Sequence, residues 1–148
     1  MAVYKGTQDG RAVHATSYAG NAWSDTNKIT PTTLALNDEV VVMFVPAGVK
    51  LTKLRYRLGD LDTGTTLAYK VGYRSKHADP DVASVLDYFG SGLTAGQSAV
   101  ATWTDYVFDD ITFQEPVEIV LTVTTATTGI SGTPSLYYQA DGVVVGVT

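Results

Sequence analysis

A chain of 148 residues, 45% of them hydrophobic, is long enough to bury a core as one domain without disulfides or metals. It has no cysteine, which excludes disulfides, thiol nucleophiles and cysteine-ligated metals. No window approaches the about 20 apolar residues of a membrane span, and the first residues lack the apolar core of a secretory leader, so we expect a soluble, unprocessed protein with no membrane partner.

The net charge of −5 is distributed unevenly along the chain. All ten Lys and Arg residues lie at or before Lys76. Ten bases against six acids give residues 1–76 a charge of +4, and nine acids without a base give residues 77–148 a charge of −9. This split favours docking between copies or onto a charged partner, unless the strands of the two halves interleave and mix the charges in space.

Residues 1–28 have the composition of an extended arm. They are rich in Gly, Ser, Thr and Asn, with isolated aromatic residues, and such a segment usually orders only against another surface. The candidate contacts of this arm are Tyr4, Tyr18 and Trp23. We expect a single folded domain over residues 29–148.

Two strands are predicted at the start of this domain. Residues 29–36 indicate a short edge strand, because Pro31 cannot donate a hydrogen bond to a central ladder. The segment Glu39–Val45 is apolar on both faces, so it is either a central strand covered on both sides or a strand at a subunit contact.

Residues 46–73 predict a β-hairpin with one apolar and one basic face. Apolar and basic residues alternate from Lys53 to Leu58, and the alternation resumes at Leu67 after a Gly-Asp-Leu-Asp-Thr-Gly turn. A change of parity after Leu51 indicates a bulge near Thr52. Parity places the bases on one surface, which is the candidate contact for a partner or an adjacent subunit and consists of Lys53, Arg55, Arg57, Lys70 and Arg74.

A short helix is predicted over about residues 80–89. Asp79 suits the N-cap, Pro80 the first helical position and Gly90 the C′ position, and four apolar residues between them form one stripe. Further strands are predicted at residues 98–102, 106–108, 117–123 and 135–139. Together these elements predict an all-β fold, an antiparallel, jelly-roll-like β-sandwich with one short helix.

No motif indicates catalysis or a bound cofactor. The two histidines, His14 and His77, are not part of any nucleophile motif. His77 with Asp79 and Asp81 could ligate a metal, but both acids are explained by the predicted helix start. The Asp60 turn begins like a calcium loop and lacks the glutamate expected at position 12, which favours a polar turn. We therefore expect no enzyme activity, no metal and no cofactor.

The order of several motifs resembles that of a known family. The motifs are Val45-Pro-Ala-Gly48, Gly59-Asp-Leu-Asp-Thr-Gly64, Leu67-Ala-Tyr-Lys-Val-Gly72, Ala78-Asp-Pro-Asp81, a Gly/Ala-rich segment and the closing stretch from Ile119 to Gly129. Over roughly residues 38–140 this order resembles the capsid decoration (cement) proteins of tailed bacteriophages. The resemblance implies a jelly-roll-like sandwich that binds the outside of an icosahedral capsid, clamps neighbouring major capsid protein subunits and performs no chemistry. Such a protein would be made in the host cytoplasm and reside on the virion exterior.

Two further expectations concern partners. The unequal charge halves and the two-sided apolar strand favour a homotrimer, with a dimer as the alternative. The chain is acidic and its basic stripe lacks aromatic residues on the same face, which argues against nucleic acid.

The alternative function is a carbohydrate-binding or receptor-binding β-sandwich module of a phage fibre or appendage. Trp23, Trp103 and nine tyrosines could provide a flat aromatic platform for sugars. Against it, Tyr56, Tyr69 and Tyr73 have core parity, and Trp103 lies between predicted strands, where a large ring ordinarily buries.

Overall fold

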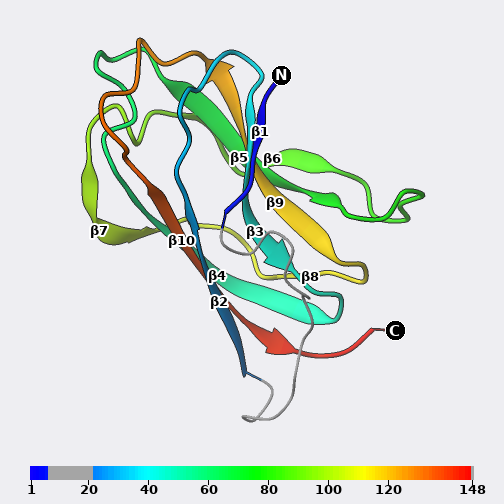
Figure 1. The fold of residues 1–148 in the computed structure, drawn as a ribbon. Helices are drawn as coiled ribbons and strands as arrows, with labels where there is room; N and C mark the ends of the chain where they lie inside the picture. Colours follow the sequence, from blue (N-terminus) through cyan, green and yellow to red (C-terminus); the bar gives the residue numbers. More distant parts are fainter. Residues whose placement is uncertain (7–21, 148) are drawn as a thin grey trace.

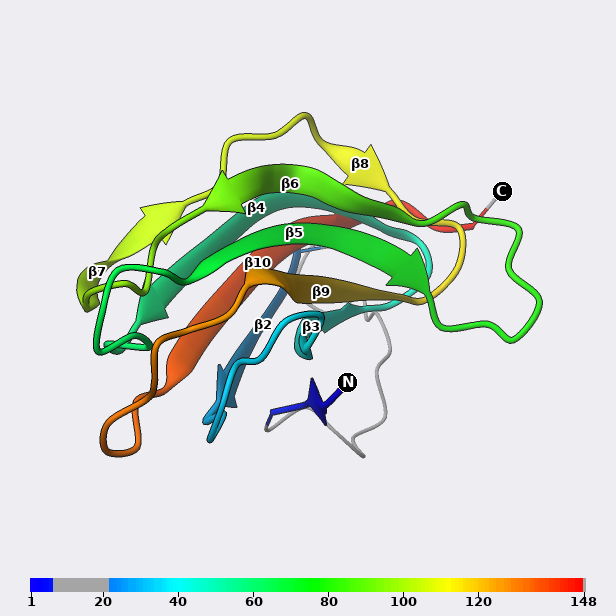
Figure 2. The ribbon, with the colours of Figure 1, turned by 90° about the horizontal axis from the view of Figure 1, so that it is seen from above.

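The computed structural model describes residues 1–6 and 22–147, and within them the chain forms strands and no helix. The strands form two sheets that pack face to face (Figures 1 and 2). The predicted all-β sandwich is therefore confirmed, and the predicted helix is not present.

The first sheet has the order β1-β3-β9-β5-β6. Its strands are antiparallel except for β1, which pairs in parallel with β3. Their bounds are Val3–Tyr4 for β1, Glu39–Val45 for β3, Val117–Thr125 for β9, Ala68–Ser75 for β5 and Val85–Leu93 for β6.

The second sheet has the order β2-β10-β4-β7, and a short strand, β8, also pairs with β4. All its pairings are antiparallel. The bounds are Ala22–Ile29 for β2, Leu136–Val144 for β10, Val49–Leu58 for β4, Val100–Asp105 for β7 and Ile111–Thr112 for β8.

The core lies between the sheets, and β3 is buried on both of its faces. Every residue of β3 is buried, as the continuous apolar run predicts for a strand covered on both sides. Val41 and Phe44 form a second small cluster with Val120 of β9, apart from the main core. Of the two alternatives for this segment, burial within the chain is the one observed. The main core draws on both sheets and includes Ile29, Val45, Leu54, Tyr69, Ile119 and Tyr138.

The predicted helix over residues 80–89 is wrong, because its residues belong to an exposed loop and to β6. The backbone N–H groups of Asp81 and Val82 donate to the Glu115 carboxylate at 2.6 and 3.0 Å. This distant side chain thus supplies the hydrogen-bond acceptor that an N-cap residue would supply at the start of a helix. β6 then approaches β5 closely at Gly72, where a Cβ atom would lie 2.1 Å from the Val85 carbonyl oxygen. Tertiary pairing thus overrides the local helix signals.

The predicted hairpin is also wrong in its pairing. Both strands exist, but β4 lies in the second sheet and β5 in the first, so the segment between them crosses from one sheet to the other. The predicted bulge near Thr52 is confirmed. Asp141 of β10 opposes Lys53 and Gly142 opposes Leu51, which leaves Thr52 without a partner in the register.

The expected arm differs from the structure at its C-terminal end. Residues 22–28 belong to β2, and Trp23 is 8% exposed within the main core, so it is a core residue and not an arm contact. Tyr4 lies in β1 and packs partly buried against the core, whereas Tyr18 lies outside the described residues. The edge strand predicted over residues 29–36 is absent, because β2 ends at Ile29.

The later strands agree with prediction in part. The strand predicted at 98–102 is shifted to β7, residues 106–108 form no strand, and the segments 117–123 and 135–139 lie largely within β9 and β10.

The crossing between the sheets is organised by the carboxylate of Asp62, which is buried. This carboxylate accepts hydrogen bonds from four backbone N–H groups, those of Leu67, Gly64, Thr128 and Thr66. Burial by itself would raise the pKa of Asp62, but these four donors outweigh it and hold the pKa well below its usual range. The motif is therefore a structural turn, and it joins the crossing segment to the loop after β9.

Replacing Asp62 with Ala should lower the free energy of unfolding by about 3 kcal/mol or more, because several buried N–H groups lose their acceptor. Chemical denaturation followed by circular dichroism measures this loss. The control is Asp60→Ala, which removes one 3.2 Å bond to the Asp62 N–H and should cost only about 0.5 kcal/mol. Equal losses for the two variants would contradict the structural role of Asp62.

The loss of unfolding free energy caused by Asp62→Ala should depend on pH. The folded-state pKa of Asp62 is below the unfolded value of about 3.9, so its stabilisation is complete above that value and is lost as the pH falls through the folded-state pKa. The difference between wild type and Asp62→Ala should be constant near neutral pH and shrink in acid.

Candidate interaction surface

Three of the predicted cations share the solvent side of the second sheet. Lys53, Arg55 and Arg57 alternate along β4 with residues that face the core, as the sequence parity predicts. In the strand register, Arg57 opposes Tyr137 of β10, and Tyr137 in turn opposes Lys28 of β2. We call this surface the basic face and define it by Lys28, Lys53, Arg55, Arg57, Trp103 and Tyr137.

Aromatic rings contact three of the four cations of the basic face. The Arg57 guanidinium lies 4.5 Å from the centre of the Tyr137 ring and 5.5 Å from that of Trp103. Arg55 lies 5.1 Å from the Trp103 ring, and the Lys28 ammonium lies 5.7 Å from the Tyr137 ring. Each such contact contributes about 0.5–1 kcal/mol at an exposed site, so the contacts fix the direction of the charges more than they stabilise the fold.

Arg55 is further oriented by a side-chain hydrogen bond. Its Nε donates to the Gln139 Oε1 at 2.9 Å, and its Nη2 donates to the same oxygen. The neighbouring Asp141 accepts a bond from the Ser24 hydroxyl at 2.7 Å. These bonds run across the strands and tie β4, β10 and β2 together on their solvent side.

Lys50 of β4 pairs with Asp110 at 3.9 Å, but the other three bases of this strand have no such partner among the described residues. Asp105 opposes Arg55 and Asp141 opposes Lys53 in the register, so acids of the second half do interleave with the bases. Even so, no carboxylate of the described residues forms a salt bridge with Lys53, Arg55 or Arg57. The basic face therefore presents positive charge that a partner can bind.

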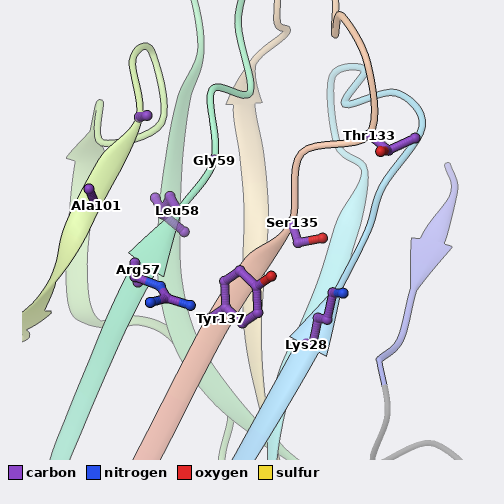
Figure 3. Close-up of a pocket in the computed structure, with 9 residues that line it drawn as sticks. Lys28, Arg57, Leu58, Gly59, Ala101, Thr133, Ser135 and Tyr137 are labelled. Atoms are coloured by element: carbon purple, nitrogen blue, oxygen red, sulfur yellow. The ribbon is translucent and has the colours of Figure 1, made fainter.

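A pocket of about 470 Å³ lies at one end of the basic face (Figure 3). Arg57, Tyr137 and Lys28 line it from three adjacent strands, and Thr133 and Ser135 line it from the loop that precedes β10. The Gly59 N–H donates to the Ser135 carbonyl at 2.9 Å, and the hydroxyls of Ser135 and Thr30 are 2.8 Å apart. The wall formed by this loop is therefore fixed to the sheet.

A close approach at Gly59 also fixes the pocket wall. A Cβ atom at this position would lie 2.7 Å from the Cβ of Pro134, so only glycine lets the end of β4 pass this close to the loop. The pocket is thus part of the folded scaffold and does not depend on a ligand for its shape.

The remaining two predicted bases lie on the other sheet. Lys70 and Arg74 project from β5 on the solvent side of the first sheet, so the structure does not bring all five bases together. Arg74 binds the carboxylates of Glu39 and Glu118 at 2.6 and 3.0 Å, which neutralises its charge. The predicted single basic surface is therefore wrong for these two residues, and the contact role of the other three stays a prediction.

The basic face carries aromatic residues that its own strand does not indicate. The prediction that the basic stripe lacks aromatic residues on the same face is wrong, because Trp103 and Tyr137 from neighbouring strands lie against its arginines. Trp103 was expected to be buried and is 38% exposed. The sequence does indicate that Tyr137 faces away from the core, because it lies between the buried residues Leu136 and Tyr138. Its position beside Arg57, however, depends on pairing with a distant strand.

The residues around Glu115 anchor a loop. The Ser75 hydroxyl donates to this carboxylate at 2.5 Å, and the His77 Nδ1 lies 3.1 Å from it. The Ser75 bond is the main cause that lowers the pKa of Glu115, with the loop N–H groups and His77 adding to it against burial. Among the described residues no group of three or more His, Cys, Asp or Glu side chains is arranged to hold a metal. The same part of the chain has no helix long and apolar enough to cross a membrane.

Comparison with known proteins finds similarity in structure only. No protein-family model matches the sequence, and no curated protein matches it. Solved structures do match. The capsid of Ralstonia phage GP4 superposes with a TM-score of 0.71 and 17% identity, covering 99% of both chains. The Cyanophage Pam1 capsid asymmetric unit gives 0.63 and 18%, covering 90% of this chain and 91% of the other.

A third match is the acid-stable capsid structure of the Helicobacter pylori bacteriophage KHP30, with a TM-score of 0.57 and 15% identity over 86% of this chain and 90% of that one. At these identities the comparisons show a shared fold. The structural neighbours of this chain are thus chains from phage capsids, and they match almost its whole length.

Arg74 binds two carboxylates and Lys70 binds none among the described residues, so these two bases of β5 should respond differently to substitution. Arg74→Met should lower the free energy of unfolding by about 2 kcal/mol, because it leaves the Glu39 and Glu118 carboxylates without their shared cation. Lys70→Met on the same strand and face is the matched control, and it should change stability by about 0.5 kcal/mol or less. Urea denaturation measures both, and a similar effect of the two substitutions would refute the structural assignment of Arg74.

Proposed function

We propose that this protein is a structural virion protein that binds the exterior of an icosahedral phage capsid and stabilises contacts between major capsid protein subunits. The observation that carries the proposal is the likeness to phage capsid chains over almost the full length of the chain. The motif order shared with decoration proteins supports the same function. In this proposal the chain is made in the host cytoplasm and performs no chemistry.

The basic face is the proposed contact surface. Arg55 and Arg57 are oriented by aromatic rings, and neither forms a salt bridge with a carboxylate of the described residues. Docking of acidic groups onto these two side chains therefore breaks no ion pair among those residues. Carboxylates of the capsid or of an adjacent copy are the proposed partners. The segment around Tyr18, with Tyr4, keeps its proposed role as an additional contact.

The alternative function is a carbohydrate-binding or receptor-binding module. Exposure of Trp103 on an open sheet favours it, since sugars stack on exposed rings. However, Arg55 and Arg57 both lie over the Trp103 ring, and Arg57 also lies over Tyr137. The rings are thus occupied by cations, which favours an anionic partner over a neutral sugar. A glycan-binding screen on the isolated protein tests this alternative.

Reversal of charge on β4 should reduce capsid binding. The triple variant Lys53→Glu, Arg55→Glu, Arg57→Glu should bind purified particles about a hundredfold more weakly or worse, because like charges at an interface cost several kcal/mol. The loss should be smaller at high salt, where exposed charges are screened. Co-sedimentation with undecorated particles measures occupancy. The control is Lys70→Glu on the other sheet, and wild-type occupancy of the triple variant in low salt would exclude the basic face as the contact.

The free protein is proposed to form a homotrimer, with a dimer as the alternative. Positive charge on one face and an excess of acids in the second half of the chain allow unlike patches of neighbouring copies to meet. Sedimentation equilibrium near physiological salt should give three times the 15.8 kDa mass of the chain. A monomer at tens of micromolar would contradict self-assembly in solution.

A further inference from the structure

The loop between β5 and β6 projects away from the sandwich at the end opposite to the segment that links β4 to β5 (Figures 1 and 2). The pocket lies toward that other end, because Leu58 at the end of β4 and the following Gly59 line it. The outer residues of the loop, 76–81, are exposed. Asp79 and Asp81 form no ion pair with a described residue. The molecule therefore carries two acids without an ion pair among the described residues at one end, and at the other end Arg57, a base that also forms no ion pair with a described residue.

The loop is held in a defined shape. The Asp81 and Val82 N–H groups bind one oxygen of Glu115, and Ser75 and His77 contact the other oxygen. The Lys76 N–H donates to the Pro116 carbonyl at 2.9 Å. Because the loop is already ordered, binding through it loses little conformational entropy.

The pocket offers donors that match a carboxylate. The Arg57 guanidinium makes ring contacts and donates no hydrogen bond to any residue that the structure describes. Its fork of N–H groups is therefore free to bind a carboxylate with two parallel bonds. Lys28 and the hydroxyls of Thr133 and Tyr137 line the same space. A volume of 470 Å³ accommodates more than one carboxyl group and is in the range of ordinary ligand pockets.

We propose that the β5–β6 loop of one copy binds in the pocket of the next copy, with Asp79 and Asp81 meeting Arg57 and Lys28. This inference rests on the proposed function and deepens it, because it assigns the pocket end of the basic face to a second copy of this chain. The contact joins two different surfaces, so it is heterologous, and repetition either closes a ring such as the trimer or links copies in rows. On a capsid, such links would fasten neighbouring copies to each other.

Disulfide trapping tests the contact directly, since the chain has no cysteine of its own. A variant with Ala78→Cys, which keeps both loop acids, is mixed with a variant carrying Thr133→Cys in the pocket wall. Under mild oxidation the mixed disulfide should form at least about tenfold faster than between Ala78→Cys and a control, Ser91→Cys, on the exposed part of β6. Equal rates for the two pairs would overturn the proposal.

Charge exchange provides the second test. Arg57→Glu should slow trapping about tenfold or more, and Asp79→Arg with Asp81→Arg in the partner copy should restore it. Lys53→Glu, on the same face but outside the pocket, is the matched control and should change the rate little. A slow rate that the loop substitutions do not restore would also overturn the proposal.

The outcomes separate this inference from the proposed function. If trapping fails while the triple variant loses capsid binding, the pocket faces the capsid protein and the proposed function stands alone. If trapping and charge exchange succeed while capsid binding is unchanged, the contact between copies stands and the basic face is not the capsid contact.

Discussion

The buried carboxylate of Asp62 is the interaction on which the arrangement of the two sheets depends. It binds N–H groups at the start of β5 and another in the loop after β9, which lies 66 residues away in the sequence. The chain leaves the second sheet at Leu58 and enters the first at Ala68 around this one group. Four amide donors on one buried carboxylate make the crossing specific, because another path would leave those donors without an acceptor.

This crossing also determines which bases remain available to a partner. Had β4 and β5 paired, all five predicted bases would share one surface. Instead β5 places Arg74 beside Glu39 and Glu118, whereas β4 places Arg57 beside aromatic rings. The same residue type is thus structural on one sheet and exposed for contact on the other, and topology alone makes the difference.

Features governed by near neighbours could be predicted from the sequence. Alternation predicted the shared face of Lys53, Arg55 and Arg57, and the parity change predicted the bulge at Thr52. A continuous apolar run predicted the two-sided burial of β3. Each of these depends on the two-residue period of a strand, which is visible within a few positions.

Features governed by distant pairing could not be predicted. The Asp79 segment carries good helix-start residues, yet Glu115, from 34 residues further along, binds its N–H groups and β5 pairs with the residues that follow. Likewise, no local pattern shows that Trp103 and Tyr137 lie beside Arg57, because that depends on the order of β10, β4 and β7 in the sheet. The pocket was missed for the same reason.

The position of β10 in the second sheet has a consequence for biosynthesis. β10 lies between β2 and β4, and it is the strand that pairs with β2 over eight residues of register. During translation, β2 therefore lacks its sheet partner until the ribosome has released residues near 144, when most of the chain is already made. Contacts over such long sequence separations form slowly, so folding of this sheet is delayed until β10 has left the ribosome. In that interval Trp23 and Ile29, which become core residues, lack their final cover, and the nascent chain is most exposed to association with other unfolded chains.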